Sequence, residues 1–207
     1  MKNVEDIYPV TPMQQLMLLH TTAHRERDRL LTQFGFELSG HLNAEAFKRA
    51  WQAVVDHHPM LRTAFVARKA DTPLQVVRKR VELPFHLHDW RDHTDPRASL
   101  DALRDADRRD GFDPKRAPLM RLHVARVGPR QWYVLWTSHH LLMDRWCLTT
   151  LFGDVDAAYE QVFRGERVDL PARPGFGRYV NWLKEQDAAQ AEQYWRRELE
   201  GFGEPTP

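Results

Sequence analysis

The segment "QWYVLWTSHHLLMDRWCL" (residues 131–148) places a run of alternating side chains directly before two histidines and an aspartate. Successive residues of a strand point to opposite faces of the sheet. One face would carry Trp132, Val134, Trp136 and Ser138, and the other Tyr133, Leu135, Thr137 and His139. Because both faces are largely apolar, we expect a central strand that is covered on both sides.

The rest of the chain predicts a mixture of strands and helices around this strand. Further strands are expected at residues 32–38, 61–67, 74–79 and 119–127, and the turn "VGPRQ" (127–131) joins the last of these to 131–139 as a hairpin. The fold class that follows is α/β, an α+β sandwich in which a mixed β-sheet is covered by helices.

Helix signals are clear at several places. Thr11 is a candidate N-cap, with Pro12 at the first helical position and Gln14 placed for a capping box. Asn43 precedes an apolar stripe at helical spacing, and Pro59 should end that helix. A further helix follows the histidines and ends near Gly165. Two more are expected near 176–185 and 187–199.

Composition limits the classes of function. The chain has 207 residues, enough to bury its own core, and a net charge of +1 with the charges well mixed. This balance gives no reason to expect nucleic acid or an anionic membrane as a partner, and no stretch approaches a membrane span. A single cysteine fits a reducing cytoplasm, so we expect a cytoplasmic location.

His139 and His140 raise three alternatives. A shared metal ion is disfavoured because consecutive strand residues point to opposite faces and no cysteine cluster accompanies them. A nucleophilic Cys147 is disfavoured because a lone cysteine on an apolar helix stripe is more often inert packing. A structural, hydrogen-bonded histidine fits one member of the pair. The other is left as a candidate general base at a strand end.

The wider sequence resembles a known family. "SHHLLMDRW" (138–146) is similar to the H-H-x-x-x-D-G signature of the condensation domains of nonribosomal peptide synthetases, which have the chloramphenicol acetyltransferase-like fold. Other segments resemble family motifs in the family's order, namely "YPVTPMQQLMLLH", "HHPMLRTAF", "GFDPKRAPLMRLHVARV", "FGRYVNWL" and "AEQYWRRELEG".

The resemblance implies an organisation. Condensation domains have two lobes and are about twice this length. Residues 1–200 would form the N-terminal lobe and residues 201–207 the start of the interlobe linker. The C-terminal lobe would be absent, so the chain would be an excised or truncated fragment of a synthetase and inactive by itself.

The resemblance also implies a reaction. The amine of a carrier-bound aminoacyl thioester attacks a carrier-bound acyl or peptidyl thioester, and an amide forms. Both substrates would arrive on the phosphopantetheine arms of donor and acceptor peptidyl carrier proteins. No metal or directly bound cofactor is implied, and the partners would be those carriers, the missing lobe and the neighbouring modules. The alternatives are another acyltransferase of the superfamily, an epimerisation domain, or a non-catalytic docking or recruitment domain.

Residue roles carry over by position. His140 matches the catalytic histidine, as a base or as a group that positions the amine, and His139 matches a structural histidine. Asp144 and Arg62 match a buried salt bridge beneath the site. Arg145 stands where the family usually has glycine, and together with Trp146 it is expected to tune substrate choice.

Overall fold

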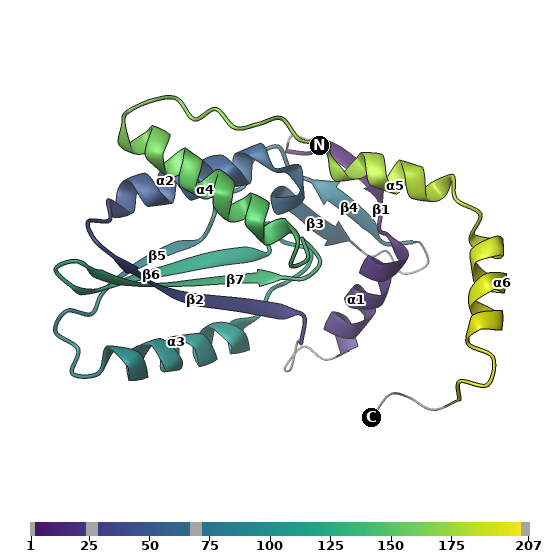
Figure 1. Ribbon diagram of the computed structural model, residues 1–207, viewed down its shortest axis with the longest axis horizontal. Coiled ribbons are helices and arrows are strands. Elements are labelled where there is room, and N and C mark those ends of the chain that lie inside the picture. Colours follow the sequence, from purple (N-terminus) through teal and green to yellow (C-terminus); the bar gives the residue numbers. More distant parts are fainter. Residues whose placement is uncertain (1–2, 24–28, 67–71, 204–207) are drawn as a thin grey trace.

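The computed structural model describes residues 3–23, 29–66 and 72–203, and the elements in these ranges follow one another as shown in Figure 1. In chain order they are β1 (Asp6–Pro9), α1 (Pro12–Ala23), β2 (Leu31–Ser39), α2 (Ala44–His57), a 3₁₀ turn (Pro59–Arg62), β3 (Thr63–Val66), β4 (Leu74–Val77), β5 (Phe85–Asp89), α3 (Pro96–Asp110), β6 (Met120–Gly128), β7 (Gln131–His139), α4 (Cys147–Phe163), α5 (Phe176–Lys184) and α6 (Ala188–Glu198).

The main sheet has four strands in the order β2–β7–β6–β5. Strand β7 pairs antiparallel with both β2 and β6, and β5 pairs parallel with β6. The central position of β7 and the β6–β7 hairpin, both expected from the sequence, are confirmed. The sheet is mixed, as the fold class requires.

Helices cover both faces of this sheet (Figure 1). Helices α2 and α4 pack together over one face, and α3 crosses the other. Trp51 of α2 and Trp136 of β7 are completely buried between the layers, with ring centroids 6.3 Å apart. Burial of large aromatic side chains contributes much of the stability of such a core.

Two helix starts are confirmed in atomic detail. The backbone N–H of Thr11 donates to Gln14 Oε1 at 3.0 Å, and the backbone N–H of Gln14 donates to Thr11 Oγ1 at 3.2 Å, which is a capping box. The side chain of Asn43 accepts from the N–H of Ala46 at 3.0 Å and caps α2. Gly165 follows α4 with a φ of 77°, a conformation that favours glycine.

Three elements were not expected from the sequence. Strands β1 and β5 are short and contain few consecutive apolar residues. Helix α3 fully buries only Asp107, while its apolar residues Leu100 and Leu103 are half-buried. The strand expected at 61–67 begins at Thr63, because Pro59–Arg62 forms a 3₁₀ turn. Its last residue, position 67, lies outside the described residues, as do positions 204–207 of the expected linker.

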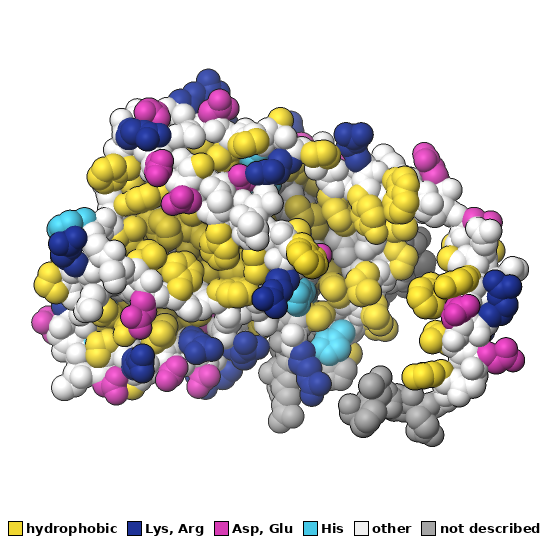
Figure 2. Space-filling model, in the orientation of Figure 1, with side chains coloured by type: hydrophobic (Ala, Val, Ile, Leu, Met, Phe, Trp, Pro, Cys, Tyr) yellow, Lys and Arg dark blue, Asp and Glu magenta, His cyan; other side chains and the backbone are white. Residues whose placement is uncertain are grey.

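A second, three-stranded sheet has the order β1–β4–β3. Helix α5 lies against it through Val180, which packs with Tyr8 and Val77. Helix α6 contains no buried residue and extends away from the body (Figure 1). Figure 2 shows hydrophobic side chains gathered on α5 and α6, and Trp182 and Trp195 are each more than half exposed.

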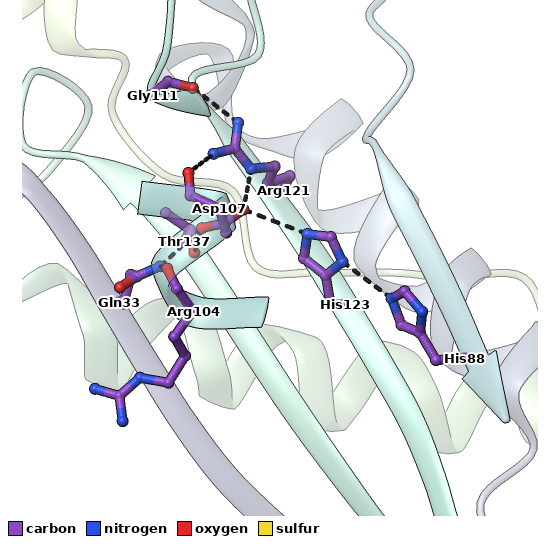
Figure 3. Close-up of polar contacts among 8 residues, drawn as sticks. All are labelled: Gln33, His88, Arg104, Asp107, Gly111, Arg121, His123 and Thr137. Carbon is purple, nitrogen blue, oxygen red and sulfur yellow. Dashed lines mark hydrogen bonds and ion pairs between the residues drawn. The ribbon is translucent and has the colours of Figure 1, made fainter. Parts of the chain in front are cut away.

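Asp107 fixes α3 to the sheet through a buried polar network (Figure 3). Its carboxylate accepts hydrogen bonds from Gln33 Nε2 at 2.8 Å, Thr137 Oγ1 at 2.6 Å and His123 Nε2 at 3.3 Å, and pairs with the guanidinium of Arg121. Burial would raise the pKa of Asp107, but the hydrogen bonds from His123, Arg121 and Thr137 outweigh it and hold the pKa well below its usual range. The buried charge is therefore compensated.

Three imidazoles extend this network to the edge strand. His88 Nε2 lies 3.1 Å from His123 Nδ1, and the ring of His86 stacks on that of His123 with centroids 4.6 Å apart. Burial, followed by the neighbouring His123, lowers the pKa of both His86 and His88.

Candidate functional site

His139 and His140 diverge at the end of β7. His139 is completely buried, whereas His140 is exposed and lines a cavity of about 820 Å³. Trp136 and Ser138 of β7 line the same cavity, together with residues of β2 and α4. The alternation predicted for the strand therefore separates the two imidazoles into different environments.

Hydrogen bonds hold His139 in place. Its Nδ1 accepts from the backbone N–H of Leu141 at 3.1 Å, and its Nε2 lies 3.0 Å from Thr21 Oγ1 of α1. An Nδ1 that accepts from an N–H group carries no proton, so Nε2 bears the hydrogen and donates to the threonine. The geometry is that of a structural histidine.

His140 has the opposite tautomer. Its Nδ1 lies 3.2 Å from the carbonyl oxygen of Met143, three residues further along the same loop. A carbonyl only accepts, so Nδ1 must carry the hydrogen, and Nε2 of the neutral ring is left with its lone pair. An acceptor nitrogen on a cavity-lining imidazole is suited to take a proton from a substrate or to hydrogen-bond its N–H.

Asp144 orders the loop that carries His140. Its Oδ1 accepts from the backbone N–H groups of Trp146 at 3.0 Å and Cys147 at 3.2 Å, at the start of α4. A carboxylate at this position satisfies N–H groups that have no partner within the helix and interacts favourably with the helix dipole. These hydrogen bonds fix the His140 loop to the start of α4.

The expected salt bridge between Asp144 and Arg62 is not formed, which corrects the sequence interpretation. Arg62 is buried and pairs with Glu5, with Nη1 and Oε2 2.8 Å apart, and its guanidinium also donates to the carbonyls of Val55 and Arg78. The physical reason is that all three acceptors surround the guanidinium beside β4, while Asp144 is exposed and engaged with α4.

Arg145 lines the 820 Å³ cavity and is exposed. Within the described part of the chain its side chain makes no hydrogen bond or ion pair, so its charge is available to a ligand. Trp146 is 89% exposed, and it is not among the residues that line this cavity. The structure thus separates the two residues that the sequence grouped together.

Cys147 is exposed and not buried, which corrects the expectation of inert packing. Its Sγ lies 3.3 Å from Asp144 Oδ1 and donates to it. Desolvation at the start of α4 raises the pKa of the thiol, so the reactive thiolate is disfavoured. Nucleophilic chemistry at Cys147 remains unsupported.

Two residues that position the histidines were not predicted from the sequence. Thr21 forms a hydrogen bond with His139, which is 118 positions away in the sequence, and no local sequence pattern predicts such a distant partner. Met143 acts through its backbone carbonyl, which every residue type has, so its side chain gives no sequence signal.

Among the described residues no group of three or more His, Cys, Asp or Glu side chains is placed to hold a metal ion, and no helix is long and apolar enough to cross a membrane.

A mixed sheet covered by helices, with a central strand that ends in a buried and an exposed histidine, agrees with the chloramphenicol acetyltransferase-like fold expected from the sequence. The condensation-domain family matches residues 4–207, and the chain belongs to that family. It is 40% identical to a linear gramicidin synthase of Brevibacillus parabrevis over 209 residues, which is 100% of this chain. It is 33% identical to a plipastatin synthase of Bacillus subtilis (strain 168) over 206 residues, which is 99% of this chain.

Solved structures agree on the fold. The starter condensation domain of rhizomide synthetase superposes with a TM-score of 0.82 at 20% identity, over 94% of this chain and 50% of that one. The first condensation domain of the calcium-dependent antibiotic synthetase, in complex with a substrate analogue, superposes with a TM-score of 0.85 at 18% identity, over 99% and 51%. The chain thus spans about half of these domains, and 4% and 8% of the gramicidin and plipastatin synthases.

Proposed function

We propose that this chain supplies the N-terminal half of a peptide-synthetase condensation domain, which forms an amide between two carrier-bound substrates. The family match supports the reaction class. The observation that carries the proposal is the placement of His140 on the 820 Å³ cavity, with Nδ1 held by the Met143 carbonyl.

The chemistry needs few groups from the protein. The acceptor amine nitrogen attacks the donor thioester carbonyl, a C–N bond forms, the C–S bond breaks, and the leaving sulfur takes up a proton as the amine loses one. An α-amine has a pKa of about 8, so a neutral fraction is present without a strong base. His140 Nε2 then accepts the hydrogen bond of the attacking amine, and either accepts its proton or orients it.

We propose His139 and Asp144 as residues that position His140. His139 anchors the end of β7 to α1, and Asp144 anchors the other end of the loop to α4. Arg62 stabilises the neighbouring sheet through Glu5 and has no direct part in the site.

We propose Arg145 as the substrate-selecting residue. Its cation lines the cavity without a partner among the described residues, so a substrate carboxylate could pair with it. Trp146, almost fully exposed, would act at the rim of the site or on a partner surface.

The proposed partners are the donor and acceptor peptidyl carrier proteins, whose phosphopantetheine arms would deliver the thioesters, and a C-terminal lobe that closes the site. Residues 201–207 would begin the linker to that lobe. The single cysteine supports a cytoplasmic location for this assembly. A non-catalytic docking domain is the second candidate, and the ordered tautomer of His140 argues against it.

Reconstitution tests the proposal. The chain is incubated with loaded donor and acceptor carriers, first alone and then with the separately expressed C-terminal half of a condensation domain. We expect amide formation only in the second case, because one half lacks the opposing wall that orients the thioesters. Turnover by the chain alone would favour a complete small acyltransferase, and no turnover by a soluble, assembled pair would favour the docking domain.

A further inference from the structure

A second cavity lies on the other side of the loop that carries His140. It has a volume of about 570 Å³, and we name it the rear pocket. Its wall comes from four segments: residues 57–61 at the end of α2 and in the turn after it, residues 142–144 of the His140 loop, the first turns of α4, and residues 172–176 at the start of α5 and before it. The size falls in the usual range for small-molecule sites.

The titratable side chains of the rear pocket are already engaged with other groups of the described chain. His58 Nε2 lies 2.8 Å from Asp154 Oδ2, and Arg173 donates to both oxygens of the same carboxylate at 2.7 and 3.2 Å. His57 Nε2 lies 3.0 Å from the carbonyl oxygen of Pro171, and Asp144 Oδ1 already accepts from the start of α4. An anionic ligand would find the guanidinium of Arg173 already paired with Asp154, so the pocket does not favour a negatively charged molecule.

The remaining wall is apolar and adaptable. It consists mainly of Met60, Leu61, Leu142, Met143, Leu151 and Phe176. Methionine side chains adjust readily to the shape of a ligand. The wall therefore matches an uncharged, largely apolar molecule.

Two residues belong to both cavities. Met143 and Asp144 line the rear pocket and also the His140 cavity, and the Met143 carbonyl holds His140 Nδ1. We propose that the rear pocket is a separate binding site for an uncharged, largely apolar small molecule, and that its occupation alters the environment of His140 through Met143.

Adjacent residues of α4 provide a matched pair of variants. Thr150 lines only the rear pocket, whereas Thr149 lines only the His140 cavity. Thr150→Trp fills the rear pocket, and Thr149→Trp fills its neighbour with the same side chain. Ala172→Trp, on the opposite wall, provides a second way of filling the rear pocket in case Thr150→Trp does not fold.

The test uses the neutral fluorescent probe N-phenyl-1-naphthylamine and the 207-residue chain. We expect saturable binding that Thr150→Trp or Ala172→Trp weakens about tenfold or more, with Thr149→Trp close to wild type. Cys147, the single cysteine of the chain, lies on the rear-pocket wall, so the bound probe should slow its alkylation by iodoacetamide.

Four results would overturn the proposal. Absence of saturable binding removes the site. Loss of binding in Thr149→Trp alone assigns the probe to the His140 cavity, and equal binding by all variants assigns it to the apolar faces of α5 and α6. Binding in the rear pocket without any change in the ¹⁵N signals of the His140 ring would refute the connection through Met143.

Discussion

Arg62 and Glu5 form an ion pair, with Nη1 and Oε2 2.8 Å apart, that joins the 3₁₀ turn before β3 to the residue preceding β1. The arginine side chain is 5% exposed and the glutamate 43% exposed. The same guanidinium donates to the backbone carbonyls of Val55 and Arg78. One buried cation therefore connects α2 to the three-stranded sheet.

A double-mutant cycle tests whether Arg62 forms its ion pair with Glu5 or with Asp144. Glu5→Ala should cost about 1 kcal/mol, because the carboxylate is partly solvated, and Arg62→Ala should cost more, because two carbonyls also lose their donor. The free energies of unfolding from urea titrations should show coupling between positions 62 and 5 and additivity between positions 62 and 144. Coupling confined to 62 and 144 would restore the salt bridge expected from the sequence.

Asp144 should behave as a helix cap. Asp144→Ala removes the acceptor of two backbone N–H groups and should lower the free energy of unfolding by about 1 kcal/mol. Asp144→Asn keeps an acceptor oxygen and should lose less. Thermal denaturation of the two variants side by side distinguishes this role, since a charge-pairing role would make them equally destabilised.

Substitution of His140 should affect catalysis, whereas substitution of His139 should affect stability. In a condensation domain containing both halves, His140→Ala should reduce amide formation by about 10²-fold and leave the melting temperature unchanged. His139→Ala should destabilise the fold by roughly 1–3 kcal/mol, because the N–H of Leu141 and the hydroxyl of Thr21 lose their partner. Normal condensation kinetics in His140→Ala would refute the assignment.

Arg145 should select substrates by charge. Arg145→Gly should reduce condensation of donors or acceptors that carry a carboxylate about tenfold or more relative to neutral ones, and Arg145→Lys should lie between. The comparison of kcat/KM across acidic and neutral thioesters measures this. An identical profile for all three forms would mean that the guanidinium points away from bound substrate.

Stability should fall in mildly acidic solution. His58, His86 and His88 have lowered pKa values, each mainly through burial, so the unfolded chain binds more protons than the folded one as the pH drops below about 6.5. The free energy of unfolding should therefore rise with pH across that region. Asp107, whose pKa is also lowered, adds stability that is lost only in stronger acid.

The histidine cluster can be tested with a matched control. Combining His86→Asn with His88→Asn should flatten the pH dependence between pH values of about 5.5 and 7.5, measured by urea unfolding. His41→Asn, at an exposed position outside the cluster, should leave the slope unchanged. An unaltered slope in the double variant would assign the effect to His58 instead.

Local patterns were sufficient for the central part of the fold. Alternation in residues 131–139 predicted β7 and its two covered faces, and the capping residues Thr11 and Asn43 predicted two helix starts. Helix α3 was missed although Asp95 caps its start and Pro96 follows, whereas the network of Asp107 that joins it to the sheet has no local sequence signal.

The sequence by itself determined the family, the order of motifs and the separation of His139 from His140, because these depend on residue identity and on the period of a strand. Only the tertiary structure decided that Arg62 pairs with Glu5, that Asp144 caps α4, and that Met143 sets the tautomer of His140. Ion pairs and hydrogen bonds depend on atoms within about 3 Å of one another, and which residues come that close is fixed by chain folding, not by their spacing in the sequence.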